Sequence, residues 1–284
     1  MQWARVGHAV ARCTGAFYGP QLSTNEELGL TYQHIESAID GVIATLTLNR
    51  PPLNIMHIEM LDEMNSALLD LRSHPKLKVL VIRGRGEAFS GGVDPADYTS
   101  DKLSRAIQVF HRVFETMRLL DVIAVGAVDG IAFGGGFELA LMCNLIVASE
   151  SARFGLPEIK TASIPPLACV VLPRAGPRRK AMEWILTGEE IPVQDLERFG
   201  LVNRVFADAE FETGLVKFLS KLTSMSGPVL NLAKRTQIES YYAGYEEALF
   251  KAENVFLGKL TSLDDFQEGI SSLLEKREPK WTES

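Results

Sequence analysis

The sequence predicts an α/β fold followed by a helical C-terminal region, and three observations lead to this class. Short runs rich in Val and Ile are each followed by a glycine loop and a helical pattern, and this unit occurs at least twice. From Asp208 to about Lys276 the pattern is helical, with a few glycine interruptions. The chain of 284 residues is 46% apolar, enough for one substantial core or two modest ones. We expect an N-terminal extension over residues 1–27, a core over 28–206 and a helical region over 207–284.

The first unit begins at Val42. Val42 to Leu48 is rich in branched residues and partly alternates, which is typical of a strand, and Asn49 to Pro52 ends it. Apolar residues at helical spacing predict a helix from Met60 to Leu71. Val79 to Ile82 predicts a second buried strand. Phe89 to Pro95 then forms a loop that contains two glycines.

The second unit follows the same order. Leu103 to Leu120 has its apolar residues on one side and predicts a helix, and Val122 to Val128 predicts a buried strand. Phe137 to Cys143 has too few polar residues for a surface helix, so we expect it to be buried. The remaining predicted elements are a helix from Arg178 to Leu186 closed by Gly188, a strand from Gly200 to Val205, and a last helix that begins at a capping box of Ser262 and Asp265.

Three consecutive glycines, Gly134, Gly135 and Gly136, lie between the strand predicted at Val122 to Val128 and the helix predicted at Phe137 to Cys143. Glycine amides at a helix start point outward unpaired, and the helix dipole adds partial positive charge, so this position favours an oxyanion. Glu138 lies in the first turn of the helix, and Glu158 follows in a turn marked by Gly and Pro. Amide donors with two carboxylates are suited to moving protons at carbon next to a carbonyl. The alternatives are a flexible glycine turn and a structural first-turn glutamate.

Composition excludes several kinds of function. A net charge of −7 argues against an electrostatic nucleic-acid binder. Cys13, Cys143 and Cys169 are widely spaced, and two of them have apolar neighbours, which predicts buried, reduced thiols. The five histidines show no metal-ligand spacing, and dinucleotide and triphosphate motifs are absent from the sequence. No apolar run reaches the length of a membrane span. We expect no metal, no nucleic acid and no membrane partner.

The first 27 residues contain basic residues such as Arg5 and Arg12 and no acid until Glu26, which is the composition of a mitochondrial transit peptide. The interpretation we favour is an upstream start codon or a disordered extension of a bacterial protein. The expected location is therefore cytoplasmic, with the mitochondrial matrix as the alternative.

The sequence resembles the enoyl-CoA hydratase/isomerase (crotonase) superfamily from about Ile43 to Lys280. The motifs that carry the resemblance, in order, are Leu48-Asn49-Arg50-Pro51, Phe89-Ser90-Gly91-Gly92-Val93-Asp94, Asp129 to Ala140, Ala152 to Glu158, Leu186-Thr187-Gly188, Gly200 to Asn203 and Glu275-Lys276-Arg277. The resemblance implies a spiral of strand-strand-helix turns, a C-terminal helical region that packs in trimers or dimers of trimers, and an acyl-CoA thioester substrate. Coenzyme A belongs to that substrate, and no separate cofactor is implied.

The resemblance also implies roles for individual residues. The thioester oxygen would sit between the backbone amides of Val93 and Gly135, and Glu138 and Glu158 would be the catalytic pair of a hydratase that adds water reversibly in the syn sense. Further contacts to the substrate or its CoA would come from Ser90, Gly91, Gly92, Asp94, Gly134 and Pro166. An isomerase of the same fold needs only one proton-shuttling glutamate, so the presence of both disfavours it. RNA binding, known for some relatives, is disfavoured by the acidic balance.

Two positions depart from the typical hydratase pattern. Pro165 to Cys169 stands where a glycine-rich run is usual, and Pro166 removes an amide donor and stiffens that wall. Such a run resembles the branch that hydrates cyclohexa-1,5-diene-1-carbonyl-CoA, as do the Gly-Val-Asp loop and the Phe110-His111 helix. Ala96 stands where several relatives carry a lysine near the CoA phosphates, so CoA contacts are expected to use other residues.

Overall fold

The computed structural model describes residues 32–241 and 243–284. The predicted N-terminal extension, 1–27, lies outside the described residues. Two sheets and the helices around them make up the fold, which confirms the predicted α/β class. The division of the chain at residue 207 stays a prediction.

The larger sheet has six strands in the order β1-β2-β3-β5-β7-β10. Its strands are β1 (Ile35–Asp40), β2 (Ile43–Leu48), β3 (Val79–Gly84), β5 (Ile123–Val128), β7 (Leu145–Ser149) and β10 (Arg204–Phe206). β1 runs antiparallel to β2, and the other neighbours are parallel. β5 is buried at all six positions, as a run of Val, Ile, Ala and Gly in a parallel sheet requires.

The smaller sheet has four strands in the order β4-β6-β8-β9. Its strands are β4 (Ala88–Ser90), β6 (Ile131–Phe133), β8 (Arg153–Gly155) and β9 (Glu190–Pro192). After β3, β5 and β7 in the large sheet, the chain passes directly to β4, β6 and β8 in the small one. Each turn of the chain therefore adds one strand to each sheet, so the glycine loops that follow β4 and β6 lie on neighbouring strands.

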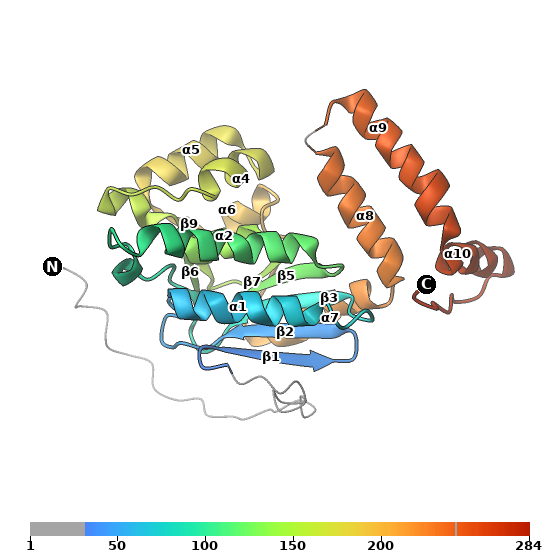
Figure 1. Cartoon of the computed structure of the whole chain (residues 1–284), viewed down its shortest axis with the longest axis horizontal. Helices are drawn as coiled ribbons and strands as arrows, with labels where there is room; N and C mark the ends of the chain where they lie inside the picture. Colours follow the sequence, from blue (N-terminus) through green and yellow to red (C-terminus); the bar gives the residue numbers. More distant parts are fainter. Residues whose placement is uncertain (1–31, 242) are drawn as a thin grey trace.

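Helices cover the faces of the large sheet. α1 (Ile58–Leu71) and α2 (Leu103–Leu119) lie side by side over it (Figure 1) and supply much of the main core, including Met60, Met64 and Phe110. α7 (Phe211–Thr223) packs Phe211, Leu215 and Leu219 against the apolar side chains of β3 and β5 in a second cluster. α3 (Gly135–Leu141) is buried over six of its seven residues, which confirms the prediction of a buried helix.

The elements after the second glutamate form a separate layer. A short 3-10 helix (Pro157–Thr161) is followed by α4 (Ala168–Ala175) and α5 (Arg178–Thr187), which lie above α2 in Figure 1. α6 (Val193–Arg198) packs against β9 and β10. α5 ends at Gly188, whose φ of 61° confirms it as the residue that closes the helix.

Three details differ from the sequence-based expectations. β1 has no counterpart among the predicted elements, because its run is short and mixes acids with apolar residues. The last strand is limited to β10, since Gly200 to Asn203 forms a turn before it. Cys169 is exposed, so its predicted burial is wrong, whereas Cys143 is buried as expected. Cys169 lies on the exposed side of the helix that begins at Ala168, whereas its neighbour Ala168 and Leu172 face the core.

The predicted capping box at the last helix is also wrong. The helix is capped at Leu263 without a side-chain bond, and Ser262 Oγ donates instead to the carbonyl of Lys259, 2.7 Å away. The Asp265 carboxylate accepts the backbone N–H of Thr282 at 2.6 Å. A long-range contact to the end of the chain thus uses the carboxylate that sequence spacing assigns to a local cap.

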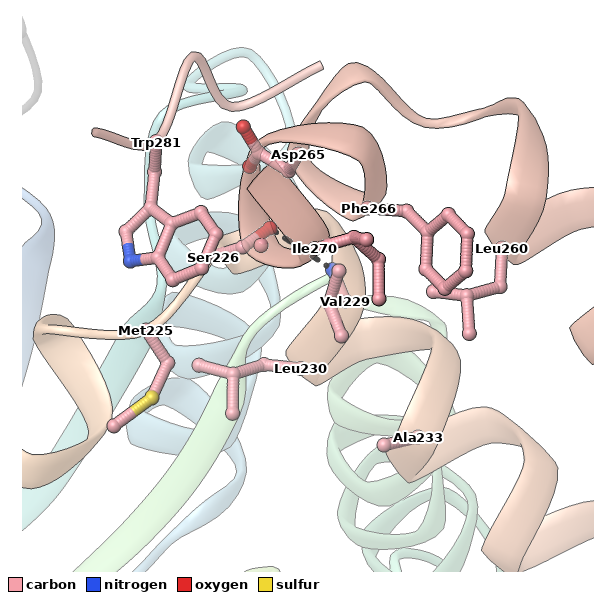
Figure 2. A pocket seen from close by; sticks show the side chains of 11 residues that line it. Met225, Ser226, Val229, Leu230, Ala233, Leu260, Asp265, Phe266, Ile270 and Trp281 are labelled. Atoms are coloured by element: carbon pink, nitrogen blue, oxygen red, sulfur yellow. Dashed lines mark hydrogen bonds between the residues drawn. The ribbon is translucent and has the colours of Figure 1, made fainter. Parts of the chain in front are cut away.

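The C-terminal helices α8 (Gly227–Ser240), α9 (Tyr245–Asn254) and α10 (Asp264–Glu275) stand to one side of the sheets (Figure 1). This arm exposes several large apolar side chains, namely Leu249, Phe250, Phe256, Leu257, Leu273 and Leu274. A cavity of about 350 Å³ lies between α8 and α10, with Trp281 and Met225 on one side and Phe266 and Leu260 on the other (Figure 2).

Candidate active site

The loops after β4 and β6 touch each other at the ends of the small sheet. A Cβ built on Gly92 would lie 3.0 Å from Phe133 O and 3.5 Å from Gly135 N. A Cβ on Gly135 would lie 2.7 Å from Val93 Cγ2 and 3.4 Å from Val93 N. Gly92 also has a φ of 114°, which side-chain-bearing residues rarely adopt. The two glycine bends therefore meet, and only residues without a side chain allow this approach.

The directions of the Val93 and Gly135 N–H groups are fixed by hydrogen bonds to the carbonyl group of the same peptide plane. Gly92 O accepts the N–H of Met56 at 2.8 Å, and Gly134 O accepts the N–H of Glu138 at 2.9 Å. In a planar trans peptide the carbonyl and the N–H point in opposite directions. Within residues 32–241 and 243–284, neither N–H is paired with a protein acceptor. Two backbone donors are thus fixed in direction and free to bind.

Glu138 is fixed next to these donors by a second helix end. It lies in the first turn of α3 and is 3% exposed. Its Oε1 accepts the N–H groups of Leu167 and Ala168, both at 2.8 Å, at the start of α4. Burial raises the pKa of Glu138 to about 7, with a further increase from the Glu158 carboxylate, while the two N–H donors oppose the shift. A carboxyl group that titrates near neutral pH is suited to proton transfer.

Glu158 approaches the triple glycine from the short helix Pro157–Thr161. A Cβ built on Gly134 would lie 2.6 Å from Glu158 Oε1, so the carboxyl group packs against the bare Cα of Gly134. Oε2 is buried and has no hydrogen-bond partner in the described part of the chain. Burial raises the pKa of Glu158. An unpartnered buried oxygen of this kind is costly unless a ligand or water donates to it.

The two carboxyl groups form one electrostatic unit. Glu138 is buried and Glu158 is half-buried, and the charge of Glu158 raises the pKa of Glu138, so ionisation of both at once is disfavoured. Both the phenol of Tyr98 and the thiol of Cys169 have a raised pKa, first because each is partly shielded from solvent although its residue is exposed, and then because of both carboxylates. Tyr98 and Cys169 therefore lie close to both glutamates.

The other residues expected to contact a substrate have a different environment. Ser90 Oγ is buried, donates to Asn54 O at 2.8 Å and accepts the N–H of Gly92 at 3.2 Å. The N–H of Gly91 donates to Leu53 O at 2.7 Å. Their polar groups are bonded within the protein, so Ser90, Gly91 and Gly92 shape the loop; direct contact with a ligand remains a prediction for them.

Three further predicted contacts are placed as follows. The carboxylate of Asp94 accepts the N–H of Ala96 and Arg50 Nη1, each at 3.1 Å, and these bonds lower its pKa although burial opposes them. Gly134 has a φ of 51° and donates its N–H to Gly155 O at 2.9 Å. Pro166 is exposed and directly precedes Leu167, one of the donors to Glu138. Asp94 lies outside the Glu138–Glu158 contacts, whereas Gly134 and Pro166 border them.

Sequence patterns missed four participants. The donors at Leu167 and Ala168 are backbone groups without a signature of their own, but Pro165 and Pro166 before an apolar run are a signal for a helix start. Tyr98 follows the Val93 loop closely enough to suggest proximity. Cys169, one residue after Ala168, could have been found once the helix start was recognised.

The cavity of the C-terminal arm is a poor alternative. Of the side chains that line it (Figure 2), Asp265 is the titratable one. Its carboxylate accepts hydrogen bonds from Thr282 and Glu283. The cavity therefore offers no group suited to proton transfer. The chemistry of the side chains therefore selects the Glu138–Glu158 site.

The described residues lack a metal-binding cluster and a membrane-spanning helix. Over 32–241 and 243–284, no group of three or more His, Cys, Asp or Glu side chains is placed to hold a metal ion. None of the described helices combines the length and the apolar character needed to cross a bilayer. The expected absence of a cofactor stays a prediction.

Comparison with known proteins gives a consistent family. Residues 38–284 match the model of the enoyl-CoA hydratase/isomerase family. A protein of Mycobacterium bovis named "Probable enoyl-CoA hydratase echA8" is 30% identical over 256 residues, which cover 89% of this chain and 99% of the relative. The rat "Enoyl-CoA hydratase domain-containing protein 3, mitochondrial" is 30% identical over 247 residues, or 86% of this chain and 82% of the relative.

Solved structures agree with these matches. The human enoyl coenzyme A hydratase domain-containing protein 3 superposes with a TM-score of 0.84 at 28% identity, covering 88% of this chain and 100% of that one. An enoyl-CoA hydratase subunit from Geobacillus kaustophilus superposes with a TM-score of 0.83 at 28% identity, covering 89% of this chain and 99% of that one.

Proposed function

Because this chain belongs to the enoyl-CoA hydratase/isomerase family, we propose that it is a hydro-lyase that adds water reversibly, in the syn sense, to an α,β-unsaturated acyl-CoA thioester. One observation carries the proposal: two free backbone N–H groups, at Val93 and Gly135, meet beside the buried carboxyl group of Glu138 and the half-buried one of Glu158, whose Oε2 is buried. Donors alone would serve many acyl transfers, but donors with a carboxyl pair match the addition of water across a conjugated double bond.

In the proposed reaction the thioester oxygen accepts both N–H groups, which stabilises the enolate-like charge that develops on it. Removing one such donor typically costs about 3 kcal/mol in the barrier. Glu138 takes a proton from water while the hydroxyl oxygen bonds to the β carbon. The electron pair of the double bond then takes the proton carried by Glu158 at the α carbon.

The assignment of these two roles follows from the contacts of each carboxyl group. Glu138 Oε1 accepts two N–H bonds, which oppose the effect of burial on its pKa and stabilise the ionised form that it takes above about pH 7. Glu158 Oε2 has no partner in the described residues, so a proton or a bound water there relieves an unsatisfied group. The two residues thus share one proton, and each turnover moves it from Glu158 to Glu138 before solvent exchange resets the pair.

Glu138→Gln and Glu158→Gln test this function. Each variant is expected to lower the hydration rate by at least about 100-fold, because general acid or base catalysis contributes on that scale. Loss of the enoyl thioester absorbance measures the rate, and equilibrium binding of a saturated acyl-CoA shows that the site still forms. Full activity in either variant contradicts the assignment.

For the acyl group we propose a cyclic dienoyl thioester, cyclohexa-1,5-diene-1-carbonyl-CoA. The Pro165-Pro166 segment before the Glu138 donors supports this choice, since it replaces a flexible glycine run by a stiff wall. Phe110 adds a flat side chain to the pocket, where its Cζ would lie 3.2 Å from a Cβ on Gly135. Turnover of the cyclic thioester is compared with that of crotonyl-CoA, and equal or better turnover of crotonyl-CoA refutes the cyclic assignment.

An isomerase of the same fold is the second candidate, because the same donors would stabilise a dienolate. Double-bond migration without hydration of the product would favour it. RNA binding remains the least supported alternative, given the net charge of −7.

For the assembly we propose a homotrimer or a dimer of trimers, supported by the apolar side chains exposed on α9 and α10. The proposed location is cytoplasmic; relatives include bacterial proteins and proteins named mitochondrial, and an import assay with residues 1–27 tests the alternative.

A further inference from the structure

The segment between β2 and α1, residues 49–57, has no part in the proposed proton transfers, yet it lies against the whole Val93 loop. Four hydrogen bonds join the two: Gly91 N–H to Leu53 O at 2.7 Å, Ser90 Oγ to Asn54 O at 2.8 Å, Met56 N–H to Gly92 O at 2.8 Å, and Asp94 N–H to Met56 O at 2.8 Å. Residues 53–56 thus act as a template, because these four hydrogen bonds fix the position of residues 90–94 along them.

The bond from Met56 is the one that aims the free donor. Gly92 O and Val93 N–H belong to one peptide plane, so holding the carbonyl fixes the direction of the N–H. Any rotation of the Met56 backbone would turn this plane with it. The orientation of the Val93 donor therefore depends on how firmly the template itself is held.

Asn54 holds the template. It is 0% exposed and has a φ of 50°, a conformation that asparagine tolerates better than most residues. Its side-chain Nδ2 donates to Ala88 O at 2.7 Å and to Arg85 O at 3.0 Å. Its Oδ1 accepts the N–H of Arg50 at 2.9 Å. Both donors and the acceptor of the amide are in use, and each anchors the template to a different part of the backbone.

Arg50 supports the template from its other end. Its Nη1 donates to Ile55 O at 2.9 Å and to Asp94 Oδ2 at 3.1 Å. The guanidinium group thus joins the residue before Met56 to the residue after Val93. The Arg50 side chain is 38% exposed, so it can be replaced with less cost to folding than the buried Asn54.

We propose that Asn54, assisted by Arg50, is a positioning residue for the reaction: it sets the direction of the Val93 N–H through Met56 and Gly92 and does not touch the substrate. The inference rests on the proposed function, in which that N–H binds the thioester oxygen. Replacing Asn54 by Asp keeps the size and the acceptor but removes both N–H donations. Complete loss of an oxyanion donor costs about 100-fold to 1,000-fold in kcat, so a misdirected donor is expected to cost about 10-fold to 100-fold.

The experiment compares Asn54→Asp with Asn65→Asp. Asn65 is a matched control, because it is also buried and its Nδ2 also donates to two carbonyls, Leu61 O at 2.9 Å and Val109 O at 3.1 Å. Both variants lose two buried donations, but one donation of Asn65 stays within α1 and the other joins α1 to α2. Three quantities are measured per folded protein: kcat, KM, and the C=O stretching frequency of a bound saturated acyl-CoA thioester.

We expect the frequency to fall on binding to the wild type and to Asn65→Asp, because two donors polarise the carbonyl. In Asn54→Asp the shift should be smaller and kcat about 10-fold to 100-fold lower, with KM within about threefold of wild type. Equal kcat and equal carbonyl shifts in the Asn54 and Asn65 variants overturn the inference, since both then act only through stability.

Two further outcomes are decided in advance. If Asn54→Asp does not fold, Arg50→Met takes its place, and an unchanged carbonyl shift with unchanged kcat there contradicts the inference. If the wild type hydrates none of the enoyl thioesters tested, the proposed function fails. The carbonyl shift of the bound saturated thioester still tells whether Asn54 directs the donor, so the two failures are distinguishable.

Discussion

The burial of Glu138 predicts a variant that is more stable and yet inactive. A glutamate carboxyl group ordinarily titrates at 4.5, and burial raises the pKa of Glu138 to about 7. The folded state therefore binds a proton that the unfolded state has released between these two pH values, so stability falls as pH rises through this window. Each pH unit costs about 1.4 kcal/mol, which gives about 3 kcal/mol above pH 7.

Glu138→Gln removes this cost. The amide oxygen can still accept the N–H groups of Leu167 and Ala168, and no charge is buried at any pH. The variant should therefore be more stable than the wild type by about 1 kcal/mol at pH 5.5 and about 3 kcal/mol at pH 8. Its hydration activity should be lost over the whole range, as expected when a destabilising group is kept for catalysis.

Urea unfolding at fixed protein concentration, repeated from pH 5.5 to pH 8, measures the difference. Glu150→Gln, on the exposed turn after β7, is the matched control for the loss of one glutamate charge. A stability gap between Glu138→Gln and the wild type that stays constant or narrows as pH rises would refute the reasoning. Such a result would mean that the two N–H donors offset the burial of the charge in full.

Three further predictions concern other parts of the molecule. Gly134→Ala should lower kcat by at least about 10-fold, because its Cβ would lie 2.6 Å from Glu158 Oε1. The control Gly86→Ala is also at positive φ but has open space around it, so it should lower stability without lowering kcat. Steady-state rates of both variants test this prediction. A bulky maleimide should inactivate the wild type but not Cys169→Ser. The rate of inactivation should increase with pH, because the pKa of the thiol is raised and the thiolate is the reactive form. Equal inactivation of both proteins would contradict this prediction. Leu273→Glu on α10 should reduce the molar mass measured by light scattering, and an unchanged mass would exclude this face from the assembly.

The units of the fold could be predicted because their signals are local. Val79–Ile82 and Val122–Val128 are continuous apolar runs, and both correspond to buried strands of the large sheet. The strands of the small sheet are three residues long, too short to produce a pattern, so β6 and β8 have no counterpart in the predictions. The predicted cap at Ser262 and Asp265 is wrong because Asp265 pairs with Thr282, a distant partner that local spacing cannot reveal.

The candidate site divides in the same way. Gly134 and Glu138 are close in sequence and could be recognised from the motif and the helix dipole. The contact between Val93 and Gly135 depends on neighbouring strands of the small sheet, which the resemblance to a family supplied and periodicity did not. The donors to Glu138 at Leu167 and Ala168 depend on backbone direction, which side-chain patterns do not encode.

The peptide planes at Gly92–Val93 and Gly134–Gly135 have a consequence for how such a centre can change over generations. A donor that belongs to the main chain is removed chemically only by proline, although a side chain at Gly135 would push it out of position. Selection and engineering can adjust the strength of such a donor through the groups that hydrogen-bond to the carbonyl of the same peptide plane. Variation in catalytic power among related chains should therefore be sought in residues such as Asn54, which a survey of substrate contacts would overlook.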